Sequence, residues 1–456
     1  MADRAKKQSI REGLCLFFYL AGFAVLCGLL IVHQHSSVFM PSVYCPPDEA
    51  DRYLIPRFIY EFGRLPIGPE REVAISGYGG SYAYLPGLSY ILMAGMMRIA
   101  SLFSGLESTL VLAARSVNLI LGLIQAVYLR RIAKRLFSDA WTGWLFCTSI
   151  LYLPQMIFVH SYVNLDALGL LSITLMLYYL LAMSQDGVSL PKCVGLSAGV
   201  VFCLLSYYNC YAFLPGCALL FLFLFLEEKD GKRRYNIRKM LQYSVPVLFM
   251  IFLGAGWWFI RSAAIHDGDF LGLRSLAAQQ AADRARVGIE MTSPLSDGIS
   301  FFEFLRTPGM FFWLFCSFIG GYGAMSIFAT KPYYLVYVVL YAAAAVGLVL
   351  RIRKEGLRKE RLPFYATLLL GALINVALWM YYSYAMDYQA QGRYVLPSVI
   401  PFAVLIVSGW EGLSGLLPEK VRRFGIPVLM GVLLILSFFF VLLVGLPRYE
   451  GFSLLG

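Results

Sequence analysis

Apolar runs of about twenty residues recur from one end of the chain to the other, and they limit its fold more than any other feature. Hydrophobic residues make up 59% of the 456 residues, and charged residues only 14%. A helical run of that length crosses the hydrocarbon core of a bilayer, which is about 30 Å thick. Backbone polar groups inside that core must be paired, as they are within a helix. We therefore predict an all-α polytopic membrane protein with a single transmembrane domain over residues 1–456.

The charges, the cysteines and the glycine patterns exclude several classes of protein. The net charge of +11 does not indicate a nucleic-acid partner, because the basic residues fall in short clusters between the apolar runs. Most of the nine cysteines lie inside apolar runs, so the sequence predicts neither a disulfide framework nor a zinc site. The sequence contains neither a P-loop nor a Rossmann glycine pattern, which argues against ATP or nucleotide-sugar chemistry in the cytoplasm.

The basic clusters predict how the chain crosses the membrane, because basic loops normally stay in the cytoplasm. The clusters are Arg4, Lys6, Lys7 and Arg11; Arg130, Arg131, Lys134 and Arg135; Lys232, Arg233, Arg234, Arg238 and Lys239; residues 351–361; and Lys420, Arg422 and Arg423. They reach one side together only if residues 84–103 and 309–329 enter the membrane without crossing it. We therefore expect about eleven crossings, with the N-terminus in the cytoplasm and the C-terminus outside. The crossings are expected near residues 12–33, 110–130, 137–153, 163–184, 192–209, 210–227, 240–260, 333–350, 362–384, 394–411 and 425–446.

Two long segments face outward in this arrangement, residues 34–109 and 261–332. Together with juxtamembrane or re-entrant helices, we expect them to cap a cavity at the outer face of the membrane. Within the second segment, residues 273–289 are polar and rich in alanine, which predicts a surface helix or lid.

An acidic pair, Asp48 and Glu49, follows the first apolar run. In a chain with so few charges, adjacent carboxylates beside the membrane surface indicate chemistry rather than solubility. The preceding Pro46 and Pro47 favour a short helix that starts after them. The alternative is that both carboxylates only complement the N-terminus of that helix, which is worth about 0.3–1 kcal/mol. Three arginines follow on the same segment: Arg52, Arg57 and Arg64.

Further polar residues are expected at the outer ends of the crossings. Asn164 and Asp166 bring another carboxylate between the third and fourth crossings. Arg393 follows the ninth crossing, where an arginine runs against the positive-inside rule, so it is a candidate to hold an anion. Arg261 follows the pair Trp257 and Trp258, which is typical of an interfacial aromatic belt, and contact with a phosphate is the other role open to it.

Three segments of the N-terminal third carry a resemblance: residues 84–92 (YLPGLSYIL), 112–118 (LAARSVN) and 130–137 (RRIAKRLF). The chain resembles the GT-C superfamily of integral membrane glycosyltransferases. Those enzymes have an acidic motif in the first external loop, a juxtamembrane stretch with proline and tyrosine, and an Ala-Arg helix that ends in a basic cytoplasmic turn. Asn164 and Asp166 match a second acidic site of several members, and residues 391–394 (QGRY) are similar to a segment of bacterial relatives.

The chain departs from that pattern in two places. Arg52 and Tyr53 stand where many relatives place a histidine. The large soluble C-terminal domain of some relatives is missing, which leaves acceptor recognition to the external loops.

The resemblance implies a sugar donor linked through phosphate to a polyprenyl chain, and transfer to an acceptor hydroxyl at the outer face. Asp48 is the expected general base, with Glu49 as the competing choice, and a single direct attack would invert the anomeric centre. The residues expected to hold the donor phosphate are Arg393 and Arg261, followed by Arg57 and Arg64.

Asp166, with Asn164, is expected to orient the acceptor or to bind a divalent metal, Mg²⁺ or Mn²⁺, for which Asp48 is another candidate ligand; the metal is left open. The remaining candidates for the cavity lining are Tyr82, Tyr84, Tyr382, Gln391 and Tyr394.

Other functions stay open at this stage. A polymerase or ligase of lipid-linked glycans would use the same outer-face chemistry. A flippase or transporter would normally show related halves and ionisable residues at mid-membrane; the sequence shows no convincing repeat, and Arg115 and Asn118 are the main polar residues inside a crossing. A non-catalytic scaffold is a third alternative. The acceptor could be a glycan, a lipid or a protein, and the expected location is a bacterial cytoplasmic membrane, although the endoplasmic reticulum would suit the same topology.

Overall fold

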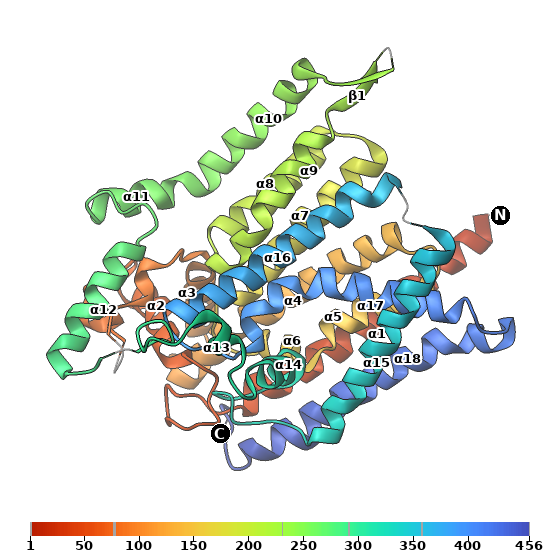
Figure 1. Cartoon of the computed structure of the whole chain (residues 1–456). Helices are drawn as coiled ribbons and strands as arrows, with labels where there is room; N and C mark the ends of the chain where they lie inside the picture. Colours follow the sequence, from red (N-terminus) through yellow and green to blue (C-terminus); the bar gives the residue numbers. More distant parts are fainter. Residues whose placement is uncertain (1, 76–78, 230, 291, 357–358, 456) are drawn as a thin grey trace.

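Long helices that lie side by side form the body of the protein (Figure 1). The computed structural model describes residues 2–75, 79–229, 231–290, 292–356 and 359–455, and the side chains of residues 2–9, 420 and 421 lie outside the described part. The predicted cytoplasmic markers Arg4, Lys6, Lys7 and Lys420 are therefore outside it. Within it, eight helices are long and apolar enough to cross a membrane: Ile10–His33, Glu107–Leu136, Asp166–Asp186, Ile237–Ile265, Lys331–Glu355, Lys359–Ala385, Gly392–Ser414 and Arg422–Tyr449.

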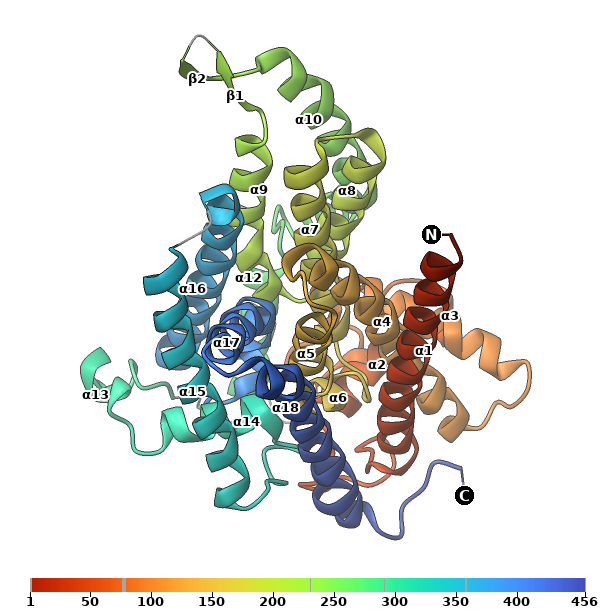
Figure 2. The same cartoon turned by 90° about the vertical axis from the view of Figure 1, so that its right-hand side faces the viewer.

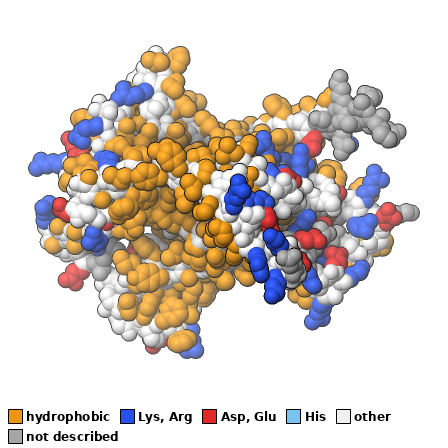
Figure 3. All heavy atoms as spheres, turned by 90° about the horizontal axis from the view of Figure 1, so that it is seen from above, with side chains coloured by type: hydrophobic (Ala, Val, Ile, Leu, Met, Phe, Trp, Pro, Cys, Tyr) orange, Lys and Arg blue, Asp and Glu red, His pale blue; other side chains and the backbone are white. Residues whose placement is uncertain are grey.

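These eight helices coincide with eight of the predicted crossings, and the all-α membrane fold is confirmed. The other three predicted crossings correspond to shorter apolar helices, Ala140–Leu151, Leu190–Leu204 and Tyr208–Phe223. The two segments expected not to cross are also short helices, Leu88–Ser101 and Met310–Gly320. In Figure 3, hydrophobic side chains cover the middle of the molecule and charged side chains gather at its two ends, as a membrane protein requires. The number of crossings stays a prediction.

The bounds of the individual elements complete this description. The helices of the body are α1 (Ala2–His33), α4 (Glu107–Leu136), α5 (Ala140–Leu151), α6 (Pro154–Val159), α7 (Asp166–Asp186), α8 (Leu190–Leu204), α9 (Leu214–Phe223), α10 (Ile237–Ile251), α11 (Trp257–Ile265), α15 (Lys331–Glu355), α16 (Leu362–Ala385), α17 (Val399–Ser414) and α18 (Glu419–Phe439). The helices of the two long connecting segments are α2 (Glu49–Phe62), α3 (Leu88–Ser101), α12 (Leu273–Val287), α13 (Phe301–Leu305) and α14 (Met310–Gly320). Short 3-10 or π turns are η1 (Arg71–Val73), η2 (Tyr82–Tyr84), η3 (Tyr208–Phe213), η4 (Phe252–Gly256), η5 (Lys359–Arg361), η6 (Gly392–Ser398), η7 (Phe440–Gly445) and η8 (Leu446–Tyr449).

Two of these helices were predicted from sequence, and both are confirmed. Helix α2 begins directly after Pro46 and Pro47. Helix α12 occupies most of the segment 273–289 and has no buried residue, as expected of a surface helix. It contacts the first long segment, because the Tyr84 hydroxyl donates to Gln279 and the backbone N–H of Gly80 donates to Asp283.

A β-hairpin joins α9 to α10, and the sequence analysis did not predict it. Strands β1 (Leu226–Lys229) and β2 (Lys232–Tyr235) pair in antiparallel register. Glu227 lies opposite Arg234, and Glu228 lies opposite Arg233, so that cross-strand pairs of opposite charge stabilise the ladder.

Several predicted cytoplasmic clusters meet at one end of the body. Glu12 of α1 pairs with Lys134 at 2.7 Å, and the Arg361 guanidinium donates to the Leu136 carbonyl. The C-terminal segment lies at the other end, where the Leu454 N–H donates to the Val32 carbonyl near the end of α1. Figure 2 shows the hairpin and the N-terminus toward one end and the C-terminus toward the other. This grouping agrees with the predicted topology; which end faces the cytoplasm stays a prediction.

Glycines allow α15 and α17 to pack backbone against backbone. A Cβ atom on Gly409 would overlap the carbonyl oxygen of Ala344, and one on Gly347 would overlap the carbonyl oxygen of Gly409. Helices in membranes commonly associate through small residues at such contacts. Because lipid tails are as apolar as the side chains, the hydrophobic effect does not drive the helices together, and close packing does.

Gly409→Leu should therefore force α15 and α17 apart and destabilise the fold by about 1–3 kcal/mol. Gly431→Leu, in α18, is the matched control, because no atom lies within 4 Å of a Cβ at that position. Thermal unfolding of the purified variants in detergent measures the effect. Equal melting temperatures for the two variants would contradict this account of the contact.

Candidate active site

Segments from the two ends of the sequence meet at the acidic loop. Asp48, just before α2, accepts a hydrogen bond of 3.0 Å at Oδ2 from Nη2 of Arg393, which lies 345 positions further on in η6. Nη2 of Arg52, one turn into α2, lies 3.8 Å from the same oxygen. Two residues that the sequence analysis singled out separately, Asp48 and Arg393, are thus joined directly.

The backbone turns the Asp48 side chain toward these arginines. Asp48 has a φ of 60° in the left-handed region, where a non-glycine residue is strained by about 1–3 kcal/mol. It stands at the N-cap of α2, yet its side chain makes no capping hydrogen bond. The carboxylate therefore faces the arginines instead of completing the helix end.

The two arginines also set the protonation state of Asp48. Burial raises the pKa of its carboxyl group, but the charges of Arg393 and Arg52, with the hydrogen bond from Arg393, lower it further than burial raises it. The pKa of Asp48 consequently lies below its ordinary value, and the group is ionised at neutral pH.

Glu49, the other candidate base, has no free oxygen. Its side chain and that of Arg115 are both fully buried, with Nη2 of Arg115 at 2.6 Å from Oε2 and Nε at 2.8 Å from Oε1. Oε1 also accepts the backbone N–H of Val163. This geometry favours Asp48 over Glu49 as the reactive carboxylate and gives Glu49 a structural contact.

Arg52 is a residue whose role the sequence analysis missed. Its side chain is 3% exposed, and its guanidinium carbon lies 4.5 Å from the centroid of the Tyr82 ring and 5.5 Å from that of Tyr207. Its Nε and Nη1 make no hydrogen bond in the part of the chain that the structure describes, and the same is true of Nε of Arg393. Buried donors without partners are rare and indicate a site for a ligand. The signal in the sequence was the position of Arg52, one helical turn after Asp48.

Asp166 and Asn164 lie at the start of α7 and have different surroundings. Asp166 is buried and interacts electrostatically with Arg52, Arg393 and Asp48, and no side chain among the described residues donates a hydrogen bond to its carboxylate. The Asn164 side chain is fully used, because Oδ1 accepts from the backbone of Asp166 and Ala167, and Nδ2 donates to two carbonyls of the preceding turn. Asn164 thus shapes the turn that presents Asp166.

Three of the arginines proposed for the donor phosphate have partners elsewhere. Arg261 donates to the carbonyls of Leu65 and Pro66 and lies over Trp258. Arg57 pairs with Glu61 and Glu107, and Arg64 pairs with Glu70. Within the described residues, no hydrogen bond or ion pair connects these three arginines to Asp48.

The remaining predicted residues also form two groups: some contact the arginines near Asp48 or each other, and the others bond elsewhere. Tyr82 lies on Arg52, Tyr394 accepts a hydrogen bond from Arg393, and the Tyr382 ring is 6.3 Å from the Tyr394 ring. Tyr84 instead bonds Gln279 of α12, and Gln391 bonds Gln389. We call the first group, together with the two arginines and the two aspartates, the arginine–aspartate cluster; it consists of Asp48, Arg52, Tyr82, Asp166, Tyr382, Arg393 and Tyr394.

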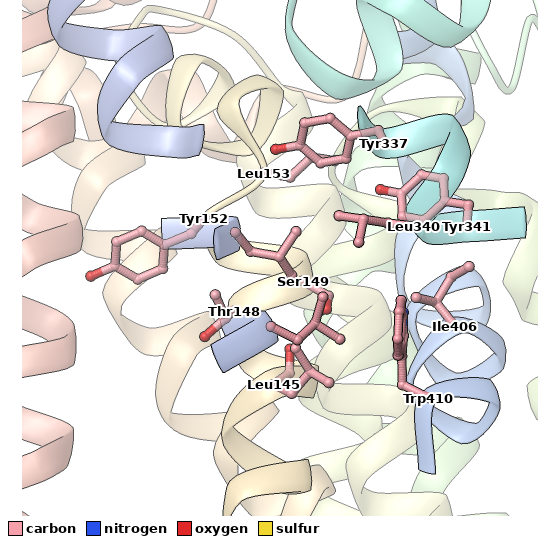
Figure 4. Close-up of a pocket in the computed structure, with 12 residues that line it drawn as sticks. Leu145, Thr148, Ser149, Tyr152, Leu153, Tyr337, Leu340, Tyr341, Ile406 and Trp410 are labelled. Atoms are coloured by element: carbon pink, nitrogen blue, oxygen red, sulfur yellow. The ribbon is translucent and has the colours of Figure 1, made fainter. Parts of the chain in front are cut away.

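Two spaces lie between helices of the membrane body. The crevice of Figure 4 lies between α5, α15, α17 and α18 and holds only about 10 Å³, roughly the least space that one water molecule needs. An apolar groove of about 450 Å³ lies between α3, α4, α7 and α8, where Leu92 and Leu168 are among its lining residues. Leu168 is two residues from Asp166 on α7, which places it on the opposite face of that helix, so the groove and the arginine–aspartate cluster lie on different sides of the start of α7.

No family model and no curated protein matches the chain. Its structure is similar to the crystal structure of an oligosaccharyltransferase from Archaeoglobus fulgidus tethered to an acceptor peptide, with a TM-score of 0.53 and 14% identity over 95% of this chain and 55% of that one. It is also similar to the arabinofuranosyltransferase AftD from Mycobacteria, with a TM-score of 0.53 and 12% identity over 94% of this chain and 27% of that one. The chain therefore spans about half the length of the first protein and about a quarter of the second.

These similarities show the fold. The chain is an integral membrane protein that shares its fold with these two glycosyltransferases, in agreement with the fold that the sequence motifs predicted. Its arginine–aspartate cluster lies on the segments that this architecture brings together at one end of the helices.

Proposed function

We propose that the protein is a membrane glycosyltransferase, which moves a sugar from a polyprenyl-phosphate-linked donor to an acceptor hydroxyl at the outer membrane face. The observation that carries the proposal is the contact between Asp48 and Arg393, a carboxylate and a guanidinium side by side in a partly buried cluster. The GT-C fold supports it.

The proposed reaction is a single displacement at the anomeric carbon. The acceptor oxygen attacks that carbon and loses its proton to the Asp48 carboxylate, while the bond from the anomeric carbon to the phosphate oxygen breaks. The polyprenyl phosphate leaves with the bonding electrons, and the anomeric centre is inverted. Arg393 stabilises the charge on the leaving phosphate through paired N–H donors.

The salt bridge between Asp48 and Arg393 links the two roles. A phosphate that accepts from the Arg393 guanidinium competes with Asp48 for the same donors. Binding of the donor therefore weakens the interaction that lowers the pKa of Asp48, and the carboxylate becomes a better base when the substrate is present.

The apolar groove supports a lipid-linked donor. It is lined by hydrophobic side chains of four helices within the membrane body, and α7 runs from this groove to Asp166 in the cluster. An isoprenoid chain in the groove would have to pass around the start of α7 for its phosphate to reach the arginines.

The contacts of the intramembrane polar residues argue against a transporter. Arg115 is bound by Glu49 and by carbonyls at the end of α1, and Asn118 donates to the carbonyls of Tyr162 and Asn164. Both side chains hold loops in place. The acceptor class, whether glycan, lipid or protein, and a location in a bacterial cytoplasmic membrane remain parts of the proposal taken from the sequence.

Mass spectrometry of lipids that copurify with the full-length protein tests the proposal. We expect a polyprenyl phosphate or its sugar conjugate to be enriched on the wild type, and to be lost from Arg393→Ala. Arg98→Gln is the control, because Arg98 is exposed and donates to the Tyr60 carbonyl away from the cluster. If all three preparations carried only bulk phospholipid, the proposed donor would be wrong.

A further inference from the structure

Arg52 and Arg393 together present unused N–H donors in a buried space. Their side chains are 3% and 8% exposed, and Nε and Nη1 of Arg52 and Nε of Arg393 make no hydrogen bond among the described residues. The hydroxyls of Tyr90 and Tyr162 are buried and have no hydrogen bond of 3.5 Å or less among the described residues, and they lie near the arginines, Tyr90 interacting with Arg52 and Tyr162 with Arg393. These donors suit an anion with several acceptor oxygens.

A divalent metal fits this site poorly. Mg²⁺ and Mn²⁺ need several oxygen ligands in near-octahedral geometry. Asp48 faces Arg393 and Arg52, and every polar atom of the Asn164 side chain is engaged. Among the described residues, no group of three or more His, Cys, Asp or Glu side chains could hold a metal ion. Two guanidinium groups in the same cluster would also repel a dication.

The charges of the cluster limit how much negative charge the bound anion can carry. Two carboxylates, Asp48 and Asp166, lie among two guanidiniums, Arg52 and Arg393, so the cluster is already balanced. A phosphodiester leaves one negative charge without a cation and brings two nonbridging oxygens for the unused donors. A diphosphate diester leaves two such charges, so the single phosphate is the less costly anion to bind.

We infer that Arg52 and Arg393 form a two-arginine site for a single phosphate, and that these side chains take the role that a divalent metal would otherwise have. The donor is then a polyprenyl monophosphate sugar, bound without a metal ion. Arg52 is a binding residue in this arrangement: the nearby rings of Tyr82 and Tyr207 position its guanidinium, and its unused Nε and Nη1 donate to the phosphate. The inference rests on the proposed function, whose donor class it narrows.

Binding of two short lipid probes to the detergent-purified full chain tests the inference. Farnesyl phosphate and farnesyl diphosphate are titrated by calorimetry at about pH 5, each in EDTA and in Mg²⁺ or Mn²⁺, because below the second pKa of a phosphate monoester, about 6, farnesyl phosphate carries one charge as the donor diester does. We expect farnesyl phosphate to bind with the same affinity in all conditions and at least about tenfold more tightly than the diphosphate. Arg52→Gln should weaken farnesyl phosphate roughly tenfold to hundredfold, since a hydrogen bond to a charged group is lost. Arg52→Lys keeps the charge but lacks the planar guanidinium, so its affinity for farnesyl phosphate should lie between those of the wild type and Arg52→Gln.

The control variant is again Arg98→Gln, which should bind like the wild type. Melting temperatures of the variants identify a misfolded Arg52→Gln, and the metal dependence of the wild type tests the inference without any variant. Binding that requires the metal, or that favours the diphosphate, would overturn the inference and leave the proposed glycosyltransferase standing. If the wild type bound neither lipid in any condition, both this inference and the proposed donor would be wrong.

Discussion

Asp48→Asn should lower the rate of sugar transfer by about 10²–10⁴-fold, because an amide of the same shape cannot accept the proton of the acceptor hydroxyl. The fold should survive, since the Asp48 side chain is 35% exposed and pairs of this kind contribute little to stability. The measurement is transfer from a polyprenyl-phosphate-linked sugar in proteoliposomes, with the melting temperature of each variant. Glu61→Gln is the matched control, an exposed carboxylate on the same helix that pairs with Arg57.

The same assay separates Asp48 from Asp166. If Asp48→Asn retained transfer and Asp166→Asn lost it, the base would be Asp166 and our assignment would be wrong. The pH dependence is a second criterion. Because Arg393 and Arg52 lower the pKa of Asp48, the carboxylate is charged throughout the neutral range. The wild-type kcat/KM, which reports the free enzyme, should therefore show no acid limb near neutrality and should fall only as the pH drops below the ordinary range of carboxyl groups.

The membrane architecture could be predicted from the sequence because its signals are local. The length of an apolar run identifies a membrane-spanning helix, and a polar Ala-rich segment identified α12. Neither prediction requires knowing which other helices pack against these segments. The short helices α5, α8 and α9 show the limit of this reasoning. Each lies in an apolar run that was predicted as a crossing, yet the helices are only 12, 15 and 10 residues long, because the sequence does not show where within an apolar run a helix ends.

The candidate site could be predicted only in part, because its contacts are not local. Asp48 and Arg393 stood out individually as charges at the outer ends of helices, but no pattern joins positions so far apart in sequence. Asp48 and Glu49 could not be told apart for a related reason. Adjacent residues point in different directions, and the left-handed backbone at Asp48 turns its side chain to η6, whereas Glu49 enters the body and meets α4.

The choice of phosphate-binding arginines from sequence included Arg57 and Arg64 but missed the buried Arg52. Arg57 and Arg64 pair with nearby carboxylates, Glu61 and Glu70, as exposed arginines usually do. Arg52 looks equally ordinary in the sequence, one turn after an acid. Only the packing of Tyr82 and Tyr207 against it removes it from solvent and leaves its donors unused.

The largest loss of stability is expected from Arg115→Leu. This variant leaves the Glu49 carboxylate fully buried without its cation, and an uncompensated buried charge costs about 3–5 kcal/mol. It also removes the donor to the carbonyls of Ile31, Gln34 and His35, which ties the end of α1 to α4. Unfolding in detergent, followed by heat or denaturant, measures the loss.

A double-mutant cycle shows whether the pair itself is responsible. Glu49→Gln with Arg115→Leu removes both charges, so the double variant should recover part of the stability that Arg115→Leu loses. Lys134→Leu is the control on the same helix, because the Lys134 side chain is 52% exposed and its pair with Glu12 should contribute less than about 1 kcal/mol. Since Glu49 directly follows Asp48, a weakened Glu49–Arg115 pair should also slow transfer, even though neither residue touches the donor in our proposal. Additive losses in the cycle would instead mean that Arg115 acts through the α1 carbonyls alone, and that Asp48 is held by other contacts.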